Sequence, residues 1–167
     1  MPESIRCEPI GLGAVLRLTS WSNVLADSEL PVQVGATLAG PTRVLCVSPD
    51  EWLLISLEQE AATLREAFSP DLLSEGAVLV DITDGIVAFE VHGAAVRDVL
   101  AQGCGLDFHP RSFVPGRCAR TRFAQIAVVL DCLEETRFAL YVARSHAHYL
   151  AAWLEDAAST APAPPAL

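Results

Sequence analysis

The stretch AVLVDITDGIVAFEVHGAAVRDVLAQG, from Ala77 to Gly103, contains the strongest local signals of this sequence. Its first part, residues 77–93, holds two runs rich in β-branched and other apolar residues, and Asp84-Gly85 separates them. Asp-Gly between two such runs is typical of a type I′ turn, because both central positions of that turn need a positive φ angle. The pattern therefore predicts a β-hairpin over residues 77–93.

The second part of the same stretch changes to a helical period. Val96, Val99 and Leu100 recur at the spacing that places them on one face of a helix over residues 94–102. Gly103 follows, and glycine is the residue that most often ends a helix in the left-handed conformation. We expect Gly103 to end the helix in that way.

The order of hairpin followed by helix is predicted twice more along the chain. The first set comprises strands over residues 43–47 and 51–57 with a helix over 58–68. The second comprises strands over residues 121–132 and 138–143, with a helix capped by Ser145 and running to about Ala157. Strands joined by tight turns, with helices between the hairpins, predict antiparallel sheets covered by helices, which is the α+β class.

These repeated hairpin-plus-helix (ββα) units suggest one compact region over residues 1–157, with possible lobes 1–75 and 76–157. A further strand is expected over residues 14–21. The Ala/Pro-rich end, ASTAPAPPAL at residues 158–167, has too few large apolar side chains to fold on its own. We therefore expect a disordered tail there.

Composition excludes several classes of function. The net charge is −10, and all 11 basic residues are arginine, so no Schiff-base lysine or phosphate-binding P-loop lysine is present. The acidic balance of the whole chain argues against nucleic acid as a partner. Hydrophobic residues make up 51%, but no apolar run reaches the ~18 residues that a membrane-spanning helix needs. The first ten residues do not resemble a secretory signal, and we expect a cytoplasmic protein.

No catalytic, cofactor-binding or metal-ligating residue is predicted from the motifs. The five cysteines are scattered without a C-x-x-C pair, which favours reduced, mostly buried thiols. His109, next to Pro110, is expected to bond nearby backbone. Asp81 and Asp84 are expected to serve turn hydrogen bonding rather than acid/base chemistry.

Four segments carry a resemblance to a known family. They are SPDEWLLIS (Ser48–Ser56), VDITDGIVAFEVHGAAVRDVLAQGCGLDFHP (Val80–Pro110), FVPGRCARTRFAQIAVVL (Phe113–Leu130) and LYVARSHAHYLAAWL (Leu140–Leu154). In this order and spacing the chain resembles the gamma subunit of heterotetrameric sarcosine oxidase. Val47 departs from the pattern, because a glycine is expected near the Pro-Asp-Glu-Trp turn, and this puts no function in doubt.

The resemblance implies a fold shared with the N-terminal region of folate-dependent aminomethyltransferases. It also implies a complex that oxidises sarcosine to glycine, with FAD, FMN, NAD, tetrahydrofolate and zinc held by other subunits and none by this chain. The family offers no catalytic residue to carry over. Two alternatives stay open: a stand-alone folate- or pterin-binding protein, and the equivalent subunit of a related N-methyl amino acid dehydrogenase complex.

The segment GCGLDFHPRSFVPGR, residues 103–117, shows neither helical nor strand periodicity. Connections of this length are often functional, and aromatic and arginine residues are enriched at interface anchors. We therefore expect this loop to dock on a large subunit through Phe108, Arg111, Phe113 and Arg117. The alternative is a self-packed loop whose phenylalanines fill the chain's own core.

Overall fold

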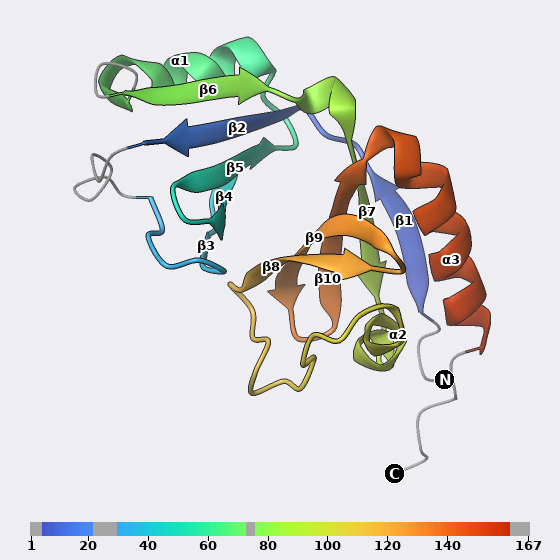
Figure 1. Cartoon of the computed structure of the whole chain (residues 1–167). Helices are drawn as coiled ribbons and strands as arrows, with labels where there is room; N and C mark the ends of the chain where they lie inside the picture. Colours follow the sequence, from blue (N-terminus) through green and yellow to red (C-terminus); the bar gives the residue numbers. More distant parts are fainter. Residues whose placement is uncertain (1–4, 22–29, 73–75, 161–167) are drawn as a thin grey trace. The chain divides into compact units, whose positions relative to one another are not determined.

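The computed structural model describes residues 5–21, 30–72 and 76–160, and it confirms the α+β class (Figure 1). Two compact units are present. The first unit covers residues 11–86, and the second combines the described residues up to Ile10 with those from Val87 onward. These units differ from the expected lobes 1–75 and 76–157 in two ways. Residues 5–10 belong to the second unit, and residues 76–86 belong to the first. No helix in the described ranges is long and apolar enough to cross a membrane.

The first unit is an antiparallel sheet with one helix. The sheet has the order β3-β4-β5-β2-β6, with bounds Thr37–Leu38, Thr42–Ser48, Glu51–Ser56, Ala14–Ser20 and Ala77–Asp81, and the helix is α1 (Ala61–Leu72). Leu64 of α1 is fully buried in a core with Leu16, Leu18 and Leu54 of the sheet. On the edge strand β6, the outward carbonyl of Leu79 accepts a hydrogen bond from Nη1 of Arg65 at 3.1 Å.

The second unit is a sheet with two helices. The sheet has the order β1-β7-β10-β9-β8, with bounds Arg6–Ile10, Ile86–His92, Arg137–Ala143, Ile126–Glu134 and Cys118–Phe123. The helices are α2 (Val96–Gly103) and α3 (Ala147–Thr160), which contact each other. Leu100 and Leu150 of these helices are fully buried in a core with Phe123 and Phe138. Strand β1 was not predicted from the sequence.

The predicted hairpin over residues 77–93 is wrong. Strand β6 pairs with β2 in the first unit, whereas β7 pairs with β1 in the second. Between them lies the 3₁₀ turn Thr83–Gly85, and Gly85 lacks the positive φ of a type I′ turn. The hydroxyl of Thr83 accepts a hydrogen bond from the backbone nitrogen of Val15 at 2.9 Å, and this hydroxyl donates to the Asp81 carboxylate at 2.7 Å. The turn is therefore tied to β2, and the chain leaves one sheet to enter another.

The other two hairpins are confirmed, but the repeated ββα unit is not. Strands β4 and β5 pair antiparallel before α1, and β9 and β10 pair antiparallel before α3. The expected single strand over residues 121–132 is two strands, β8 and β9, joined at Ala124 and Gln125. These two residues have φ angles of 47° and 72°, so the adjacent positive φ angles that Asp84-Gly85 suggested occur at Ala-Gln instead.

The predicted start of the disordered tail at residue 158 is wrong. Helix α3 continues to Thr160, and the hydroxyls of Ser159 and Thr160 donate to the carbonyl oxygen of Asp156 at 2.7 and 3.2 Å. These bonds add side-chain donors to a carbonyl in the last turn of α3. Residues 161–167 of the expected tail lie outside the described part of the chain.

Gly103 does not adopt the expected left-handed conformation; instead it lies within α2, and Cys104 after it is extended. A Cβ atom at Gly103 would lie 2.3 Å from Cζ of Phe123, deep inside the ring's contact distance. The carbonyl of Gly103 also accepts a hydrogen bond from Ala124 at 2.7 Å. Glycine is needed here because α2 approaches the β8–β9 hairpin so closely.

Gly103→Ala should therefore lower the free energy of unfolding by about 1–3 kcal/mol, the usual cost of forcing a methyl group into a filled core. Gly105→Ala is the matched control, because a Cβ there meets no atom within 4 Å. Urea unfolding of both variants measures the difference. Equal stability of the two variants would contradict the close approach, and Phe123→Leu should restore part of the loss in the Gly103→Ala background.

Candidate functional site

The loop between α2 and β8, predicted to dock on a partner, packs its phenylalanines into the second unit. Phe108 and Phe113 are each only 5% exposed. Their ring centroids lie 5.9 Å apart, and each is 6.2 Å from the ring of Phe138 on β10. The expectation that Phe108 and Phe113 are surface contacts is therefore corrected: the structure has the self-packed alternative, because burial of aromatic area in the chain's own core leaves little for a partner.

Arg97 of α2 holds this loop from the inside. Its Nη1 donates to the carbonyl oxygens of Phe108 at 2.7 Å and Phe113 at 2.9 Å, and its Nε donates to Glu135 O at 2.8 Å. The guanidinium also lies over the ring of Phe138, 5.0 Å from its centroid. One planar side chain therefore joins α2, both ends of the loop's aromatic stretch and the β9–β10 turn.

The tip of the loop is a tight turn built on Asp107 and His109. The backbone nitrogen of His109 donates to Asp107 Oδ1 at 2.9 Å, and that of Arg111 donates to His109 Nδ1 at 3.1 Å. The expected role of His109 in bonding nearby backbone is thus confirmed. The Ser112 hydroxyl and the His109 N–H hold the pKa of Asp107 below its usual value.

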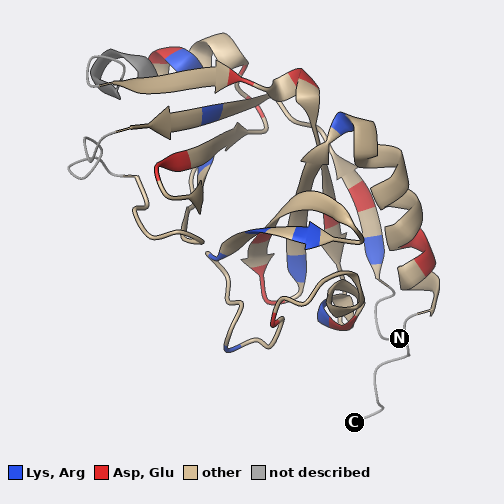
Figure 2. Ribbon diagram, in the orientation of Figure 1, with Lys and Arg blue, Asp and Glu red and all other residues tan. Residues whose placement is uncertain are grey.

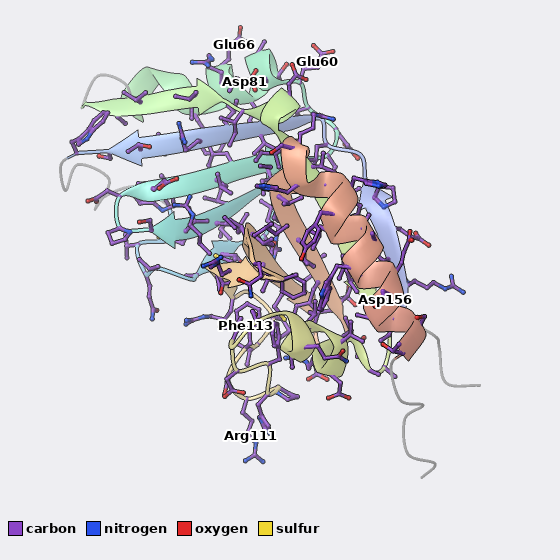
Figure 3. All side chains as sticks on the ribbon, turned by 45° about the vertical axis from the view of Figure 1, so that its right-hand side comes forward. Glu60, Glu66, Asp81, Arg111, Phe113 and Asp156 are labelled. Atoms are coloured by element: carbon purple, nitrogen blue, oxygen red, sulfur yellow. The ribbon has the colours of Figure 1, made fainter. Side chains whose placement is uncertain are left out.

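The two arginines of the loop differ from its phenylalanines. The side chain of Arg111 is exposed and projects away from the loop, while Phe113 turns back toward the core (Figure 3). Arg117 is half-buried, and its Nε is buried without a hydrogen-bond partner among the described residues. Contact of Arg111 and Arg117 with a partner stays a prediction.

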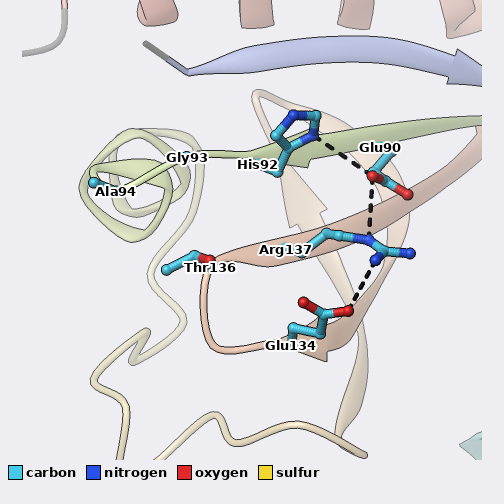
Figure 4. A pocket seen from close by; sticks show the side chains of 7 residues that line it. All are labelled: Glu90, His92, Gly93, Ala94, Glu134, Thr136 and Arg137. Carbon is cyan, nitrogen blue, oxygen red and sulfur yellow. Dashed lines mark hydrogen bonds and ion pairs between the residues drawn. The ribbon is translucent and has the colours of Figure 1, made fainter. Parts of the chain in front are cut away.

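A polar pocket of about 410 Å³ lies at one end of the second unit's sheet, where β7 ends and β9 turns into β10 (Figure 4). Arg137 lies between two carboxylates, with Nε 3.1 Å from Glu90 Oε1 and Nη1 2.8 Å from Glu134 Oε1. His92 Nδ1 is 3.5 Å from the same Glu90 oxygen. Both carboxylates are already paired with a guanidinium, so this arrangement does not provide a free general base.

Sequence reasoning missed this pocket. Glu90 and His92 lie two residues apart on one face of β7, and Arg137 is the first residue of β10. Only the pairing of these distant strands brings the three side chains together. No motif could have indicated it, because the residues are 47 positions apart along the chain at their extremes.

The remaining candidates of the sequence have structural roles. The Asp81 carboxylate accepts from the hydroxyl and backbone nitrogen of Thr83, and these hydrogen bonds lower its pKa. All five cysteines are free thiols, and Cys46, Cys118 and Cys132 are buried. Burial raises the pKa of Cys7 to about 11, with help from Glu155 and Glu8. Within the described residues, no group of three or more His, Cys, Asp or Glu could hold a metal ion.

The fold places the chain in a known class of α+β architecture. An aminomethyltransferase of the glycine cleavage system from Bartonella henselae superposes with a TM-score of 0.68 over 92% of this chain and 46% of that one. The sequence identity is 12%, so this likeness shows the fold alone.

The sequence comparisons are more specific. The family model described as "Sarcosine oxidase, gamma subunit family" matches residues 20–160. Sarcosine oxidase subunit gamma from Corynebacterium sp. (strain U-96) is 32% identical over 90% of this chain and 74% of its own length. The protein of that name from Corynebacterium sp. (strain P-1) is 32% identical over 78% of this chain and 64% of its own. The chain belongs to the sarcosine oxidase gamma subunit family.

A solved structure agrees with that assignment. A chain of the heterotetrameric sarcosine oxidase from Corynebacterium sp. U-96, in complex with pyrrole 2-carboxylate, superposes with a TM-score of 0.85. The match covers 98% of this chain and 88% of the solved one at 26% identity.

Phe113→Ala should lower the free energy of unfolding of the chain by about 3–5 kcal/mol, the usual loss for a buried aromatic side chain. Arg111→Ala, two residues away on the exposed tip, should change it by less than about 0.5 kcal/mol. Urea unfolding of each variant tests the contrast. A stability loss at Arg111 equal to that at Phe113 would contradict the packing described for this loop.

Arg97→Gln should lower the free energy of unfolding by about 2–4 kcal/mol. The substitution leaves the carbonyl oxygens of Phe108 and Phe113 without their charged donor and removes the contact with Phe138. Arg97→Lys should recover only part of this loss, since an ammonium group cannot reproduce the planar fork. Arg111→Gln serves as the control and should stay near the parent. Wild-type stability of Arg97→Gln in the same unfolding experiment would show that the loop does not depend on this guanidinium.

Proposed function

We propose that this chain is the gamma subunit of a heterotetrameric sarcosine oxidase-type flavoenzyme complex. The observation that supports this best is the TM-score of 0.85 to a chain of such an oxidase over 98% of this chain, together with the family match. The partners are the large flavin- and folate-bearing subunits of the complex, which we expect in the cytoplasm.

Within that complex the proposed role is structural rather than catalytic. The pocket of the second unit presents carboxylates that are already paired with Arg137, and the aromatic residues of the long loop fill the core. The reaction would be oxidative demethylation of sarcosine to glycine. The one-carbon unit would pass to tetrahydrofolate or leave as formaldehyde, and oxygen would be reduced to peroxide. FAD, FMN, NAD, tetrahydrofolate and zinc would reside in the other subunits.

A stand-alone folate- or pterin-binding protein is less well supported. Such a site is expected to be an enclosed, mostly apolar cavity with a few convergent polar groups. The pocket around Glu90 and Arg137 is instead open and lined mainly by charged and small residues. Likeness of fold to an aminomethyltransferase does not by itself transfer a ligand.

Affinity purification of the tagged chain from its native host tests the proposal. The expected result is co-elution with large chains that mass spectrometry identifies as sarcosine oxidase subunits, in a yellow complex that oxidises sarcosine. The separated chain should be colourless and should not retain tetrahydrofolate in equilibrium dialysis. A monomeric chain that elutes alone with bound flavin or folate would contradict the proposal, and turnover of an N-methyl amino acid such as N-methylglutamate in place of sarcosine would assign the complex to the related dehydrogenases.

A further inference from the structure

The basic residues of this acidic chain are unevenly distributed. Residues 111–122, which run from the loop tip through β8, contain four of the 11 arginines and none of the 21 carboxylates. Figure 2 shows the corresponding blue segments along the loop and β8. The rest of the chain is strongly negative and repels anions. This stretch therefore creates a local positive potential that attracts them.

Three of these four arginines have no carboxylate partner among the described residues. No ion pair or hydrogen bond joins the guanidinium of Arg111 or that of Arg117 to a described residue, and Arg122 bonds only the neutral Gln125, at 3.2 Å to its Oε1. Arg120 interacts within the chain and is set aside. Arg6 and Arg17 also lack an ion pair with a described residue, but they lie 11 positions apart with Glu8 between them, whereas these three arginines lie within 12 residues that hold no carboxylate.

The fold fixes the points at which the three side chains leave the backbone. Arg111 sits on the turn that Asp107 and His109 stabilise, and the stem of Arg117 is packed so closely that its Nε is buried. Arg122 lies on β8, the edge strand of its sheet, about 16 Å along an extended chain from Arg117. A segment whose backbone is ordered before binding loses less conformational entropy on pairing with a partner than a segment that must first fold.

We propose that Arg111, Arg117 and Arg122 form a docking strip for a carboxylate-rich surface of a large subunit of the complex. This inference rests on the proposed function and names the chemistry of one contact. The occupant is an acidic protein surface because charge complementarity selects it, and symmetric pairing of two copies of this chain through this edge is disfavoured because it would bring the two positive strips together. Pairing of exposed opposite charges acts mainly on the association rate.

The test compares two double charge reversals in reassembly of the complex. Arg111→Glu with Arg122→Glu alters the strip, and Arg6→Glu with Arg17→Glu is the matched control, because those two side chains are exposed and have no ion pair with a described residue. Each variant is mixed with large subunits stripped of the native gamma chain, and association is followed by surface plasmon resonance at low and high salt. Circular dichroism and urea unfolding confirm that both variants fold like the parent.

The strip variant should associate at least about tenfold more slowly than the parent at low salt, with a weaker salt dependence, and the control should stay within about twofold. Equal rates for the strip variant and the control would overturn the docking strip while leaving the proposed function intact. Failure of the wild-type chain to associate at all would overturn the proposed function and the strip with it. Loss of heparin binding or of self-association in the strip variant, with unchanged association to the large subunits, would reassign the strip to another anion or to copies of this chain.

Discussion

The guanidinium of Arg97 bonds three carbonyl oxygens that come from two different segments, and much of the second unit depends on it. Phe108 and Phe113 are brought to the ring of Phe138 by a loop that has no periodic hydrogen bonding of its own. Without a fixed cation behind it, that loop would bury backbone carbonyls with no donor, which is costly inside a protein. The aromatic cluster and the turn before β10 are therefore organised around one charged side chain.

A second constraint acts in the first unit and explains why the chain has two sheets. Thr83 bonds Val15 and Asp81, so the short 3₁₀ turn after β6 is anchored on the neighbouring strand β2. The following strand β7 cannot fold back beside β6 and pairs in the other unit instead. A local sequence that looks like a hairpin is thus overridden by the pairing of β6 with β2 and of β7 with β1, and the bond from Val15 to Thr83 adds to the first of these pairings.

Sequence reasoning recovered the elements better than their pairing. The helices, most strands and the buried positions Val96, Val99 and Leu100 follow from apolar periodicity, which is a local property. The hairpin at Asp84-Gly85 was predicted wrongly, and the turn at Ala124-Gln125 was not predicted. In both places positive φ was inferred from residue type, whereas the pairing of the strands imposed it on alanine and glutamine. At the candidate site, the family could be inferred from four ordered segments. The burial of Phe108 and Phe113, and the pocket around Arg137, could not be inferred, because both depend on contacts between distant strands.

The hydrogen bond from Arg65 to the carbonyl oxygen of Leu79 affects how easily other strands can pair with the edge of this sheet. Strand β6 is a sheet edge with Val78 and Val80 partly exposed, the kind of edge on which intermolecular β-sheets grow. Leu79 is the central residue of that edge, and its outward carbonyl already has a charged donor from α1. An incoming strand would have to displace this donor before it could pair in register. The Arg65 side chain therefore opposes the addition of another strand at the middle of this edge.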